Sequence, residues 1–416
     1  MKSVKRRTLL QAGLALPAIV PGARAQGSKQ VSILTWNIPN AQPLMQEWIK
    51  EFTAAHPGVT VQWLDKKGPD LPAFYQTQLV AGTPPDVIDI QGGLGIEYAA
   101  QGALLDLTPM LTQHPDVKAR FNADYLANWV FDAKNYMLPF YISKTLLFYN
   151  KPLFQKAGLT GPPGSFDAIL EHASKINGDN QSGFLTLNFD WLYWPLYKMN
   201  EIELLTPDLK HAAFDTPTMV SVTERLAKGT ASGAVDKISW TGRWVEPLGA
   251  FSSGRVGMLH AHAPAYLYIK GQGPWVNQET LGIAQMPGNW AVPNSHGLGI
   301  SAQSHNKDLA WELLSFLTDK KQSLAFARFF KVLTGNTEVD QILMADMRKN
   351  DPLGASVLET QLQFTDRMTG NWRLGDDSQV KDAFYPNLQA GLLGNRPVPA
   401  ALDAAKRAVG RVLERG

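Results

Sequence analysis

Apolar positions in the N-terminal part of the chain follow two different periods. Short apolar runs typical of buried strands alternate with stretches in which apolar side chains recur at the three- to four-residue spacing of a helix. Because such alternation is typical of a parallel sheet with right-handed crossovers, we expect ligands at the loops that follow the strand ends, 36–40 and 91–94. The second loop contains Gly92-Gly93-Leu94-Gly95, which we interpret as a tight turn. The predicted order is strand, helix, strand, helix, strand, at 31–36, 44–52, 59–64, 71–80 and 86–90.

The stretch from Tyr136 to Phe166 changes character several times over a short length. An entry rich in aromatics and proline leads into Thr145 to Tyr149, an apolar run too short for a helix and suited to a strand. Leu153 to Ala157 then predicts a short helix, and Ser165 is placed to cap the helix that follows. We interpret this stretch as the first of several segments that cross between two blocks of the protein.

Two later helices show one apolar face each. The first has its apolar stripe at Leu309, Ala310, Leu313, Leu314 and Leu317, with Asn306 as the predicted cap. The stripe of the second is formed by Leu402, Ala405, Val409, Val412 and Leu413. Because any packed helix has one apolar face, we interpret both stripes as faces that dock onto the protein itself rather than onto a partner.

The first 25 residues have the pattern of a secretory signal. A basic head precedes a 12-residue apolar stretch, Leu9 to Val20, and Ala23-Arg24-Ala25 forms a small-x-small cleavage site. Twelve residues are too few for a membrane-spanning helix, which needs about 20, so no stable membrane insertion is expected. The adjacent Arg6 and Arg7 resemble a twin-arginine signal, which implies export in the folded state. An ordinary signal with two neighbouring arginines is the alternative.

Removing this segment changes the interpretation of the charge. It carries five of the positive residues and no acid, so the formal net charge changes from +2 for the whole chain to −3 for residues 26–416. No basic block remains, and a nucleic-acid partner is therefore not expected. The chain has no cysteine, so it has no site for a lipid anchor and no disulfide. The 391 remaining residues exceed one ordinary core, which predicts two domains.

Several segments together resemble one family. They are AGTPPDVIDIQGG (81–93), GALLDLTPML (102–111), YMLPFYISKTLLFYNKPLFQKAGL (136–159), FSSGRVGML (251–259), LGIAQMPG (281–288) and GLGISAQSHNKDLAWELLSFLTDKKQ (297–322). In this order and spacing they resemble the extracellular solute-binding proteins of ATP-driven importers, specifically the maltose-binding type (solute-binding protein family 1).

The resemblance implies a fold and a role. The fold is α/β with two lobes, each a mostly parallel sheet flanked by helices, and a ligand cleft lies between them and closes about a hinge. The first lobe is expected to hold 26–140 and 287–336, and the second 141–286 and 337–416. The implied function is that of a periplasmic monomer, without a cofactor, that captures a small carbohydrate and delivers it to the permease subunits of an ABC transporter.

The candidate ligand contacts combine aromatic rings with hydrogen-bonding side chains. A sugar ring offers an apolar face that packs on an aromatic ring, and its hydroxyls need polar partners. The strand-end pairs Trp36 with Asn37 and Gln91 with Gly92 are favoured, while Tyr141 and Ser143 are candidates for both hinge and ligand contact. For any single Trp the alternative is core or surface packing. The remaining candidates are Asn40, Asp190, Trp191, Trp240, Arg243, Trp244, His260, His262, Trp290, Trp372 and Arg373.

The chain departs from the family at His260-Ala261-His262, where members commonly have a glycine and a tryptophan. Both histidines would face the same side of a strand. Two histidines without nearby Cys or carboxylate make a poor metal site, so no metal is expected, and hydrogen bonding to ligand or neighbours is favoured. Together with Arg243 and Arg373 they keep open an anionic ligand, such as glycerol phosphate or a sugar acid.

An enzyme of another class, a periplasmic glycoside hydrolase, is the rival interpretation. It would need two carboxylates facing a cleft at a set separation. Candidates exist at Asp86, Asp89, Glu97, Asp190 and Glu246, but no motif pairs any two of them. No nucleophile elbow, zinc-protease helix, Walker loop or dinucleotide fingerprint is present in the sequence. We therefore expect a binding protein and not an enzyme.

Overall fold

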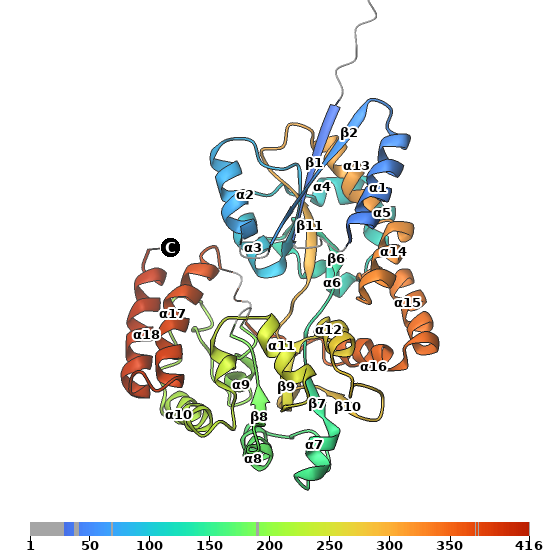
Figure 1. Ribbon diagram of the computed structural model, residues 1–416. Coiled ribbons are helices and arrows are strands. Elements are labelled where there is room, and N and C mark those ends of the chain that lie inside the picture. The colour runs from blue at the N-terminus through green and yellow to red at the C-terminus, as the bar shows by residue number, and fades with distance from the viewer. Residues whose placement is uncertain are drawn as a thin grey trace, which may run out of the picture.

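The protein consists of two lobes joined by a narrow junction (Figure 1). The computed structural model describes residues 29–36, 41–67, 70–188, 191–370, 372 and 374–415. The predicted signal segment and four candidate ligand contacts, Asn37, Asn40, Asp190 and Arg373, lie outside these residues.

The sheet of the first lobe has five strands in the order β2-β1-β3-β11-β6. Strand β1 pairs in parallel with β2 and β3, whereas β11 pairs antiparallel with both β3 and β6. The strands are β1 (Lys29–Trp36), β2 (Val59–Lys66), β3 (Val87–Gln91), β6 (Met137–Tyr141) and β11 (His296–Ile300).

The sheet of the second lobe has four strands in the order β10-β7-β9-β8. Strand β7 is antiparallel to both of its neighbours, and β8 is parallel to β9. The strands are β7 (Thr145–Asn150), β8 (Ser182–Leu185), β9 (Val256–His262) and β10 (Leu281–Ala284). A separate two-stranded ribbon in the first lobe pairs β4 (Val130–Phe131) with β5 (Lys134–Asn135).

The two-lobed α/β fold is confirmed, and all strands of each sheet but one run in the same direction. In each sheet one strand runs against its neighbours, β11 in the first and β7 in the second. These are the strands by which the chain enters a lobe from the other one. An entering strand runs away from the junction, whereas strands linked by crossovers within the lobe end at the junction.

Helices flank both sheets (Figure 1). In the first lobe they are α1 (Gln42–Ala55), α2 (Asp70–Val80), α3 (Gly92–Ala100), α4 (Thr108–Gln113), α5 (Pro115–Ala119), α6 (Ala123–Ala127), α13 (Lys307–Leu317) and α14 (Lys320–Phe330). In the second they are α7 (Lys151–Lys156), α8 (Phe166–Ile176), α9 (Pro195–Lys198), α10 (Pro217–Ser232), α11 (Val245–Ser252), α12 (Ala265–Gln272), α17 (Asp377–Leu392) and α18 (Val398–Leu413), with 3-10 turns η2 (Lys237–Trp240) and η3 (Pro287–Asn289). Helices α15 (Thr337–Asn350) and α16 (Pro352–Gln361) follow α14 beside the junction.

The predicted strands and helices of the N-terminal part are confirmed, whereas two local predictions, at Gly92 and at Asn306, are wrong. The glycines from Gly92 do not form a tight turn, because helix α3 begins at Gly92 directly after β3. Asn306 precedes α13, but its side chain does not cap the helix and donates to the carbonyl oxygen of Gln30 instead (3.0 Å). Ser165 does cap α8, since its hydroxyl accepts the N–H of Ala168 (3.1 Å).

The two apolar stripes are covered by the protein's own core. Ala310, Leu313 and Leu314 of α13 are buried in one core cluster with Val31 and Phe52 of the first lobe. Leu402, Ala405 and Val409 of α18 belong to the core of the second lobe together with Phe384 and Leu388 of α17. The prediction that these stripes are internal docking faces is confirmed. Across the described residues, no helix combines the length and the apolar character needed to cross a membrane.

Two chain segments bond to each other in the junction. The first leads from β6 to β7, and the second leads from β10 back to β11. The N–H of Thr145 donates to the carbonyl of Val292 (3.0 Å), and the N–H of Asn294 donates to the carbonyl of Ser143 (2.8 Å). The prediction that the stretch from Tyr136 to Phe166 crosses between blocks is confirmed, because β6 and β7 belong to different sheets. The division of the chain into residues 26–140 with 287–336 and residues 141–286 with 337–416 stays a prediction.

Candidate functional site

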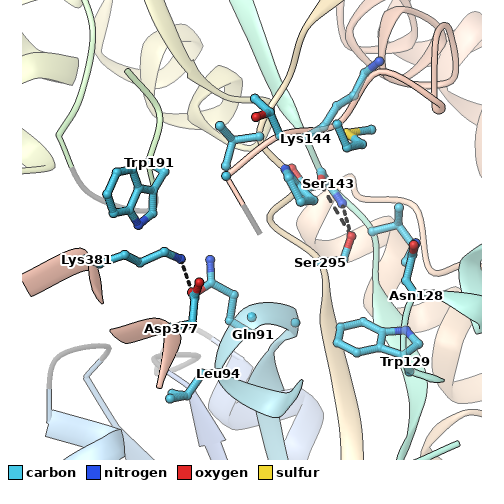
Figure 2. A pocket seen from close by; sticks show the side chains of 18 of the residues that line it. Gln91, Leu94, Asn128, Trp129, Ser143, Lys144, Trp191, Ser295, Asp377 and Lys381 are labelled. Atoms are coloured by element: carbon cyan, nitrogen blue, oxygen red, sulfur yellow. Dashed lines mark hydrogen bonds and ion pairs between the residues drawn. The ribbon is translucent and has the colours of Figure 1, made fainter. Parts of the chain in front are cut away.

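A cleft of about 1010 Å³ lies where the two lobes meet. This volume is at the upper end of the range usual for small-molecule sites, about 300–1,000 Å³. Both lobes and the junction contribute to its lining (Figure 2). The polar and aromatic side chains of the lining include Trp36, Gln91, Asp124, Asn128, Trp129, Ser143, Lys144, Asn188, Trp191, Tyr193, Ser295, Gln361, Asp366, Asp377, Ser378, Lys381, Asp382 and Tyr385.

Trp36 lies at the end of β1 and is held from behind by a buried carboxylate. The N–H of Trp36 donates to Oδ2 of Asp89 (3.2 Å), and Oδ1 of Asp89 lies 2.9 Å from Nδ1 of His296. Because a carboxylate only accepts, Nδ1 of His296 carries the hydrogen. The Trp36 ring meets the His296 ring edge-on, with centroids 5.4 Å apart. The Trp36 ring is therefore fixed by contacts that do not involve the cleft.

The start of α3 forms the neighbouring part of the same wall. Gly92, Gly93 and Leu94 line the cleft, and the N–H of Gly92 donates to the carbonyl oxygen of Ser295 (2.9 Å). A Cβ on Gly92 would lie 3.2 Å from the ring of Trp129. The absence of a side chain at Gly92 thus lets the helix start approach Trp129 closely.

The opposite wall combines a tryptophan with an ion pair on α17. Asp377 and Lys381 lie four residues apart on this helix, with Nζ of Lys381 2.5 Å from Oδ2 of Asp377. The same ammonium lies 5.5 Å from the centroid of the Trp191 ring, a cation–π distance. Figure 2 shows Lys381 between Trp191 and Asp377. An aromatic face, a donor and an acceptor therefore lie side by side in the second lobe.

Five residues of the lining each have a buried polar atom without a hydrogen-bond partner among the described residues. A buried polar group in this condition costs on the order of 1–3 kcal/mol unless water or a ligand satisfies it. One of the atoms is an indole nitrogen that can only donate, two are hydroxyl oxygens that can donate or accept, and two are oxygens that accept. The atoms are Nε1 of Trp129, Oγ of Ser143, Oη of Tyr193, Oε1 of Gln361 and Oδ1 of Asp377.

The basic groups of the described lining are already bound to acceptors. Nζ of Lys144 donates to the carbonyl oxygen of Gln363, and burial lowers the pKa of Lys144 to about 8, although Asp366 acts in the opposite direction. Lys381 is paired with Asp377. No arginine is present in the part of the lining that the structure describes.

The structure brings five of the predicted contacts together in the cleft. They are Trp36, Gln91, Gly92, Ser143 and Trp191. Tyr141 lies beneath the wall, where its ring stacks on His296 with centroids 4.4 Å apart. Tyr141 therefore supports the wall from behind and does not line the cleft, whereas Ser143 lines the cleft directly. The structure places the other described candidates away from the lining: Trp240, Arg243, Trp244, His260, His262, Trp290 and Trp372.

These seven side chains have partners within the second lobe or at its surface. Trp240 is buried in the core and donates from Nε1 to Thr230 (3.0 Å). Arg243 pairs with Glu246 on the surface. The Trp290 ring has Lys198 and Arg367 at cation–π distances of 4.8 and 5.4 Å. The Trp244 ring lies 6.4 Å from that of His262, and Trp372 meets Trp191 edge-on at 5.0 Å.

The two histidines of β9 are both buried in the second lobe. Nδ1 of His260 lies 3.2 Å from Oγ1 of Thr186, a hydrogen bond to a neighbour. Burial, with a smaller effect of His262, lowers the pKa of His260 to about 3, so this ring is neutral at physiological pH. In the portion of the chain that the structure covers, no three His, Cys, Asp or Glu side chains are grouped so that they could hold a metal ion.

The sequence did not single out the contributions of α17 and of Trp129, Lys144 and Tyr193. The only local signal for α17 is the spacing of Asp377 and Lys381, which puts both on one helix face. An ion pair at this spacing is common on any exposed helix. The position of the Asp377–Lys381 pair opposite the first lobe could not be predicted from this spacing.

Four of the carboxylates considered for a hydrolase are engaged in structural contacts outside the cleft lining. Asp86 accepts from Ser32 (2.8 Å) and Ser304 (2.6 Å), and Asp89 is bound to Trp36 and His296. Ser378 donates to Glu97 (2.7 Å), and Glu246 pairs with Arg243. None of these four therefore forms a pair that faces a ligand in this structure.

Residues 36–323 match the sequence profile of the bacterial extracellular solute-binding proteins. The chain belongs to this family. A binding protein of Brucella abortus (strain 2308) is 27% identical over 341 residues, which cover 79% of this chain and 81% of that protein. An sn-glycerol-3-phosphate-binding periplasmic protein of Rhizobium meliloti (strain 1021) is 25% identical over 401 residues, 87% of this chain and 88% of that one.

Solved structures show the same two-lobed fold. An ABC transporter solute-binding protein from Thermotoga lettingae TMO, bound with alpha-D-tagatose, aligns with a TM-score of 0.77 and 21% identity. The alignment covers 93% of this chain and all of that one. At this identity the likeness concerns the fold.

Proposed function

We propose that this solute-binding protein captures a small carbohydrate in the periplasm and delivers it to the permease subunits of an ABC transporter. The observation that carries the proposal is a cleft between the lobes that has a tryptophan on each side and polar side chains such as Gln91, Ser295 and Lys381 in its lining. A sugar offers hydroxyls that both donate and accept, and ring faces that pack on Trp36 and Trp191. The tagatose-bound structural relative supports the same ligand class.

An anionic polyol is the second candidate, because the Rhizobium meliloti relative binds sn-glycerol 3-phosphate. Phosphate and carboxylate groups are usually held by arginine or lysine whose charge is available. In the described lining both lysines already bind protein acceptors, and Asp124, Asp366 and Asp382 add negative charge. The described part of the cleft therefore favours a neutral ligand.

The mechanism is capture without chemistry. In an open form, Trp36, Gln91 and Ser295 would be exposed to solvent on one side of the cleft, and Trp191, Asp377 and Lys381 on the other. A ligand that contacts both sets binds the closed form better, and this difference in affinity shifts the population toward closure. The crossing segments around Ser143 and Asn294 are the hinge in this proposal. The permease would then recognise the closed form.

The site of action is also part of the proposal. The basic head, apolar stretch and Ala23-Arg24-Ala25 indicate a cleaved signal, and Arg6-Arg7 favours the twin-arginine route. We propose that the mature protein is a periplasmic monomer. Mass spectrometry of the exported protein should find a mature N-terminus at Gln26. A retained signal segment would contradict this part of the proposal.

A thermal-shift screen followed by calorimetry tests the proposed function. Neutral mono- and oligosaccharides should raise the unfolding midpoint, since a ligand that binds only the folded state stabilises it. Glycerol phosphate and sugar acids form the matched anionic arm. Saturable heats with a sugar and no product in the recovered solution would support a binding protein. Steady product formation would indicate a hydrolase, and a response to the anionic arm alone would favour the second candidate.

A further inference from the structure

Helices α3 and α17 belong to different lobes and touch each other. Tyr98 and Ala99 of α3 are buried in a first-lobe core with Ile88, whereas Val380 and Phe384 of α17 are buried in the core of the second lobe. Between them, Oγ of Ser378 donates to Oε2 of Glu97 at 2.7 Å. Beside this bond, Nε2 of Gln101 donates to the carbonyl oxygen of Gly375 at 3.3 Å.

The Glu97 carboxylate is suited to hold this contact. Its residue is 8% exposed, so few water molecules compete for its oxygens. A hydroxyl that donates to a carboxylate makes a charge-assisted bond, which is stronger than a bond between neutral groups. Burial raises the pKa of Glu97, and the Ser378 bond lowers it, which means that the bond favours the charged carboxylate.

Both helices also carry residues of the cleft. The start of α3 lines the cleft with Gly92 and Leu94, and Glu97 lies one turn further along. On α17, Ser378 follows Asp377 and lies one turn before Lys381. All three residues line the cleft. A contact that fixes Ser378 against α3 therefore also fixes the distance of the Asp377–Lys381 pair from the first-lobe wall.

We propose that the Glu97–Ser378 bond is a latch between the lobes, and that Glu97 is a positioning residue that holds Asp377 and Lys381 against the ligand. The latch stands on the observed contact alone. The positioning role rests on the proposed carbohydrate-binding function.

Spin-label distances test the latch without any ligand. The chain has no cysteine, so labels can be placed at Val80→Cys at the end of α2 in the first lobe and at Leu393→Cys directly after the second-lobe helix α17, both exposed positions. In this background Glu97→Ala and Ser378→Ala should each shift the distance distribution of the ligand-free protein to longer values. A tenfold change in the open-to-closed ratio is expected, which corresponds to about 1.4 kcal/mol.

Two further variants make the result specific. Glu97→Gln keeps an oxygen that can accept from Ser378 but loses the charge, so its distribution should lie between those of the parent and of Glu97→Ala. Glu312→Ala removes a carboxylate that pairs with His56 inside the first lobe, and it should leave the distribution unchanged. Melting curves by circular dichroism check that each variant is folded. Parent-like distances in both folded alanine variants would overturn the latch.

Calorimetry with D-tagatose and maltotriose tests the positioning role. For whichever sugar the parent protein binds, Glu97→Ala should weaken binding at least threefold, and Glu97→Gln should weaken it less than Glu97→Ala does. Equal affinities of the parent and both variants would overturn the positioning role. The latch would still be tested by the spin-label distances. If the parent binds no sugar in the wider thermal-shift screen, the proposed function and the positioning role fail together, and the latch is still decided separately.

Discussion

At the scale of single residues, the cleft depends on side chains that are held before any ligand arrives. Trp36 is held through its backbone by Asp89 and through its ring by His296, which itself stacks on Tyr141. Asp89 is fully buried, and both of its oxygens are engaged. A ring that is fixed in advance loses little conformational entropy when a ligand packs on it.

Replacing Trp36 with alanine should weaken carbohydrate binding at least about tenfold, or about 1.4 kcal/mol, because the packing face of the first lobe is lost. Titration calorimetry with the sugar identified in the screen measures the change. Trp290→Ala is the matched control, since this ring is half-buried and lies outside the described cleft lining. An unchanged dissociation constant for the Trp36 variant would remove it from the site.

At the scale of elements, local hydrogen bonds set where helices begin. The hydroxyl of Ser165 accepts the N–H of Ala168 at the start of α8, as predicted from the sequence. At the start of α15, the Asp340 carboxylate accepts the N–H groups of Thr334 (2.7 Å) and Gly335 (3.0 Å). The turn at Thr334 and Gly335 lies next to the junction, where the N–H of Ile142 donates to the carbonyl of Leu333 (2.7 Å).

Ser165→Ala should lower the free energy of unfolding by about 1 kcal/mol, because it removes the acceptor for a helix-terminal N–H. Urea denaturation measures the change. Ser174→Ala on the same helix serves as the control, since its hydroxyl bonds a carbonyl within the helix and leaves the terminus intact. A loss equal to that of the control would contradict the capping role.

Asp340 should make stability depend on pH in a defined direction. Burial raises its pKa from about 3.8 to about 6, although the bonds from Thr334 and Gly335 act against this. The folded state therefore binds the proton more tightly than the unfolded state. The stabilising contribution is present below about pH 3.8 and is lost as the pH rises through about 6.

Urea denaturation of the parent and of Asp340→Asn should show this effect. The stability of the parent relative to the variant should fall by about 2 kcal/mol between about pH 4.5 and about pH 7.5. Asp346→Asn on the same helix is the control, since this half-buried carboxylate pairs with Arg328 and does not bond the turn at Thr334. A stability difference that does not change with pH would show that Asp340 keeps an ordinary pKa in the folded state.

At the scale of the whole molecule, the hydrogen-bonded crossing segments and the α3–α17 contact lie on different elements around one cleft. The crossing segments provide continuous backbone between the lobes, whereas the helix contact involves side chains that can separate. This arrangement favours a hinge at the crossings and opening at the helices.

The radius of gyration should therefore fall when a bound sugar closes the lobes. Small-angle scattering of the protein with and without the sugar measures this change, with calorimetry on the same sample to prove saturation. The Glu97→Ala variant should show a larger decrease than the parent, because its ligand-free form is more open. A constant radius at proven saturation would contradict the hinge model.

The sequence by itself determined the features that depend on neighbouring residues. Strand and helix periods, the cap at Ser165 and the apolar stripe of α18 follow from side chains a few positions apart. Trp36, Gln91 and Ser143 could be placed near the cleft because a strand end or a crossing segment has a fixed position in this architecture. The same local reasoning failed at Gly92, where a helix start and a tight turn share the same glycine signal.

Only the tertiary structure decided which distant segments face each other. Trp240 and Trp191 are both buried in the core of the second lobe, yet only Trp191 also lines the cleft. Strand β11 runs antiparallel to β3, and Asp377 and Lys381 lie opposite α3. Both arrangements arise because distant parts of the chain return to a lobe that the chain had left earlier. The physical reason is that apolar periodicity shows which face of an element is buried, but the partner that covers this face is selected by packing between elements.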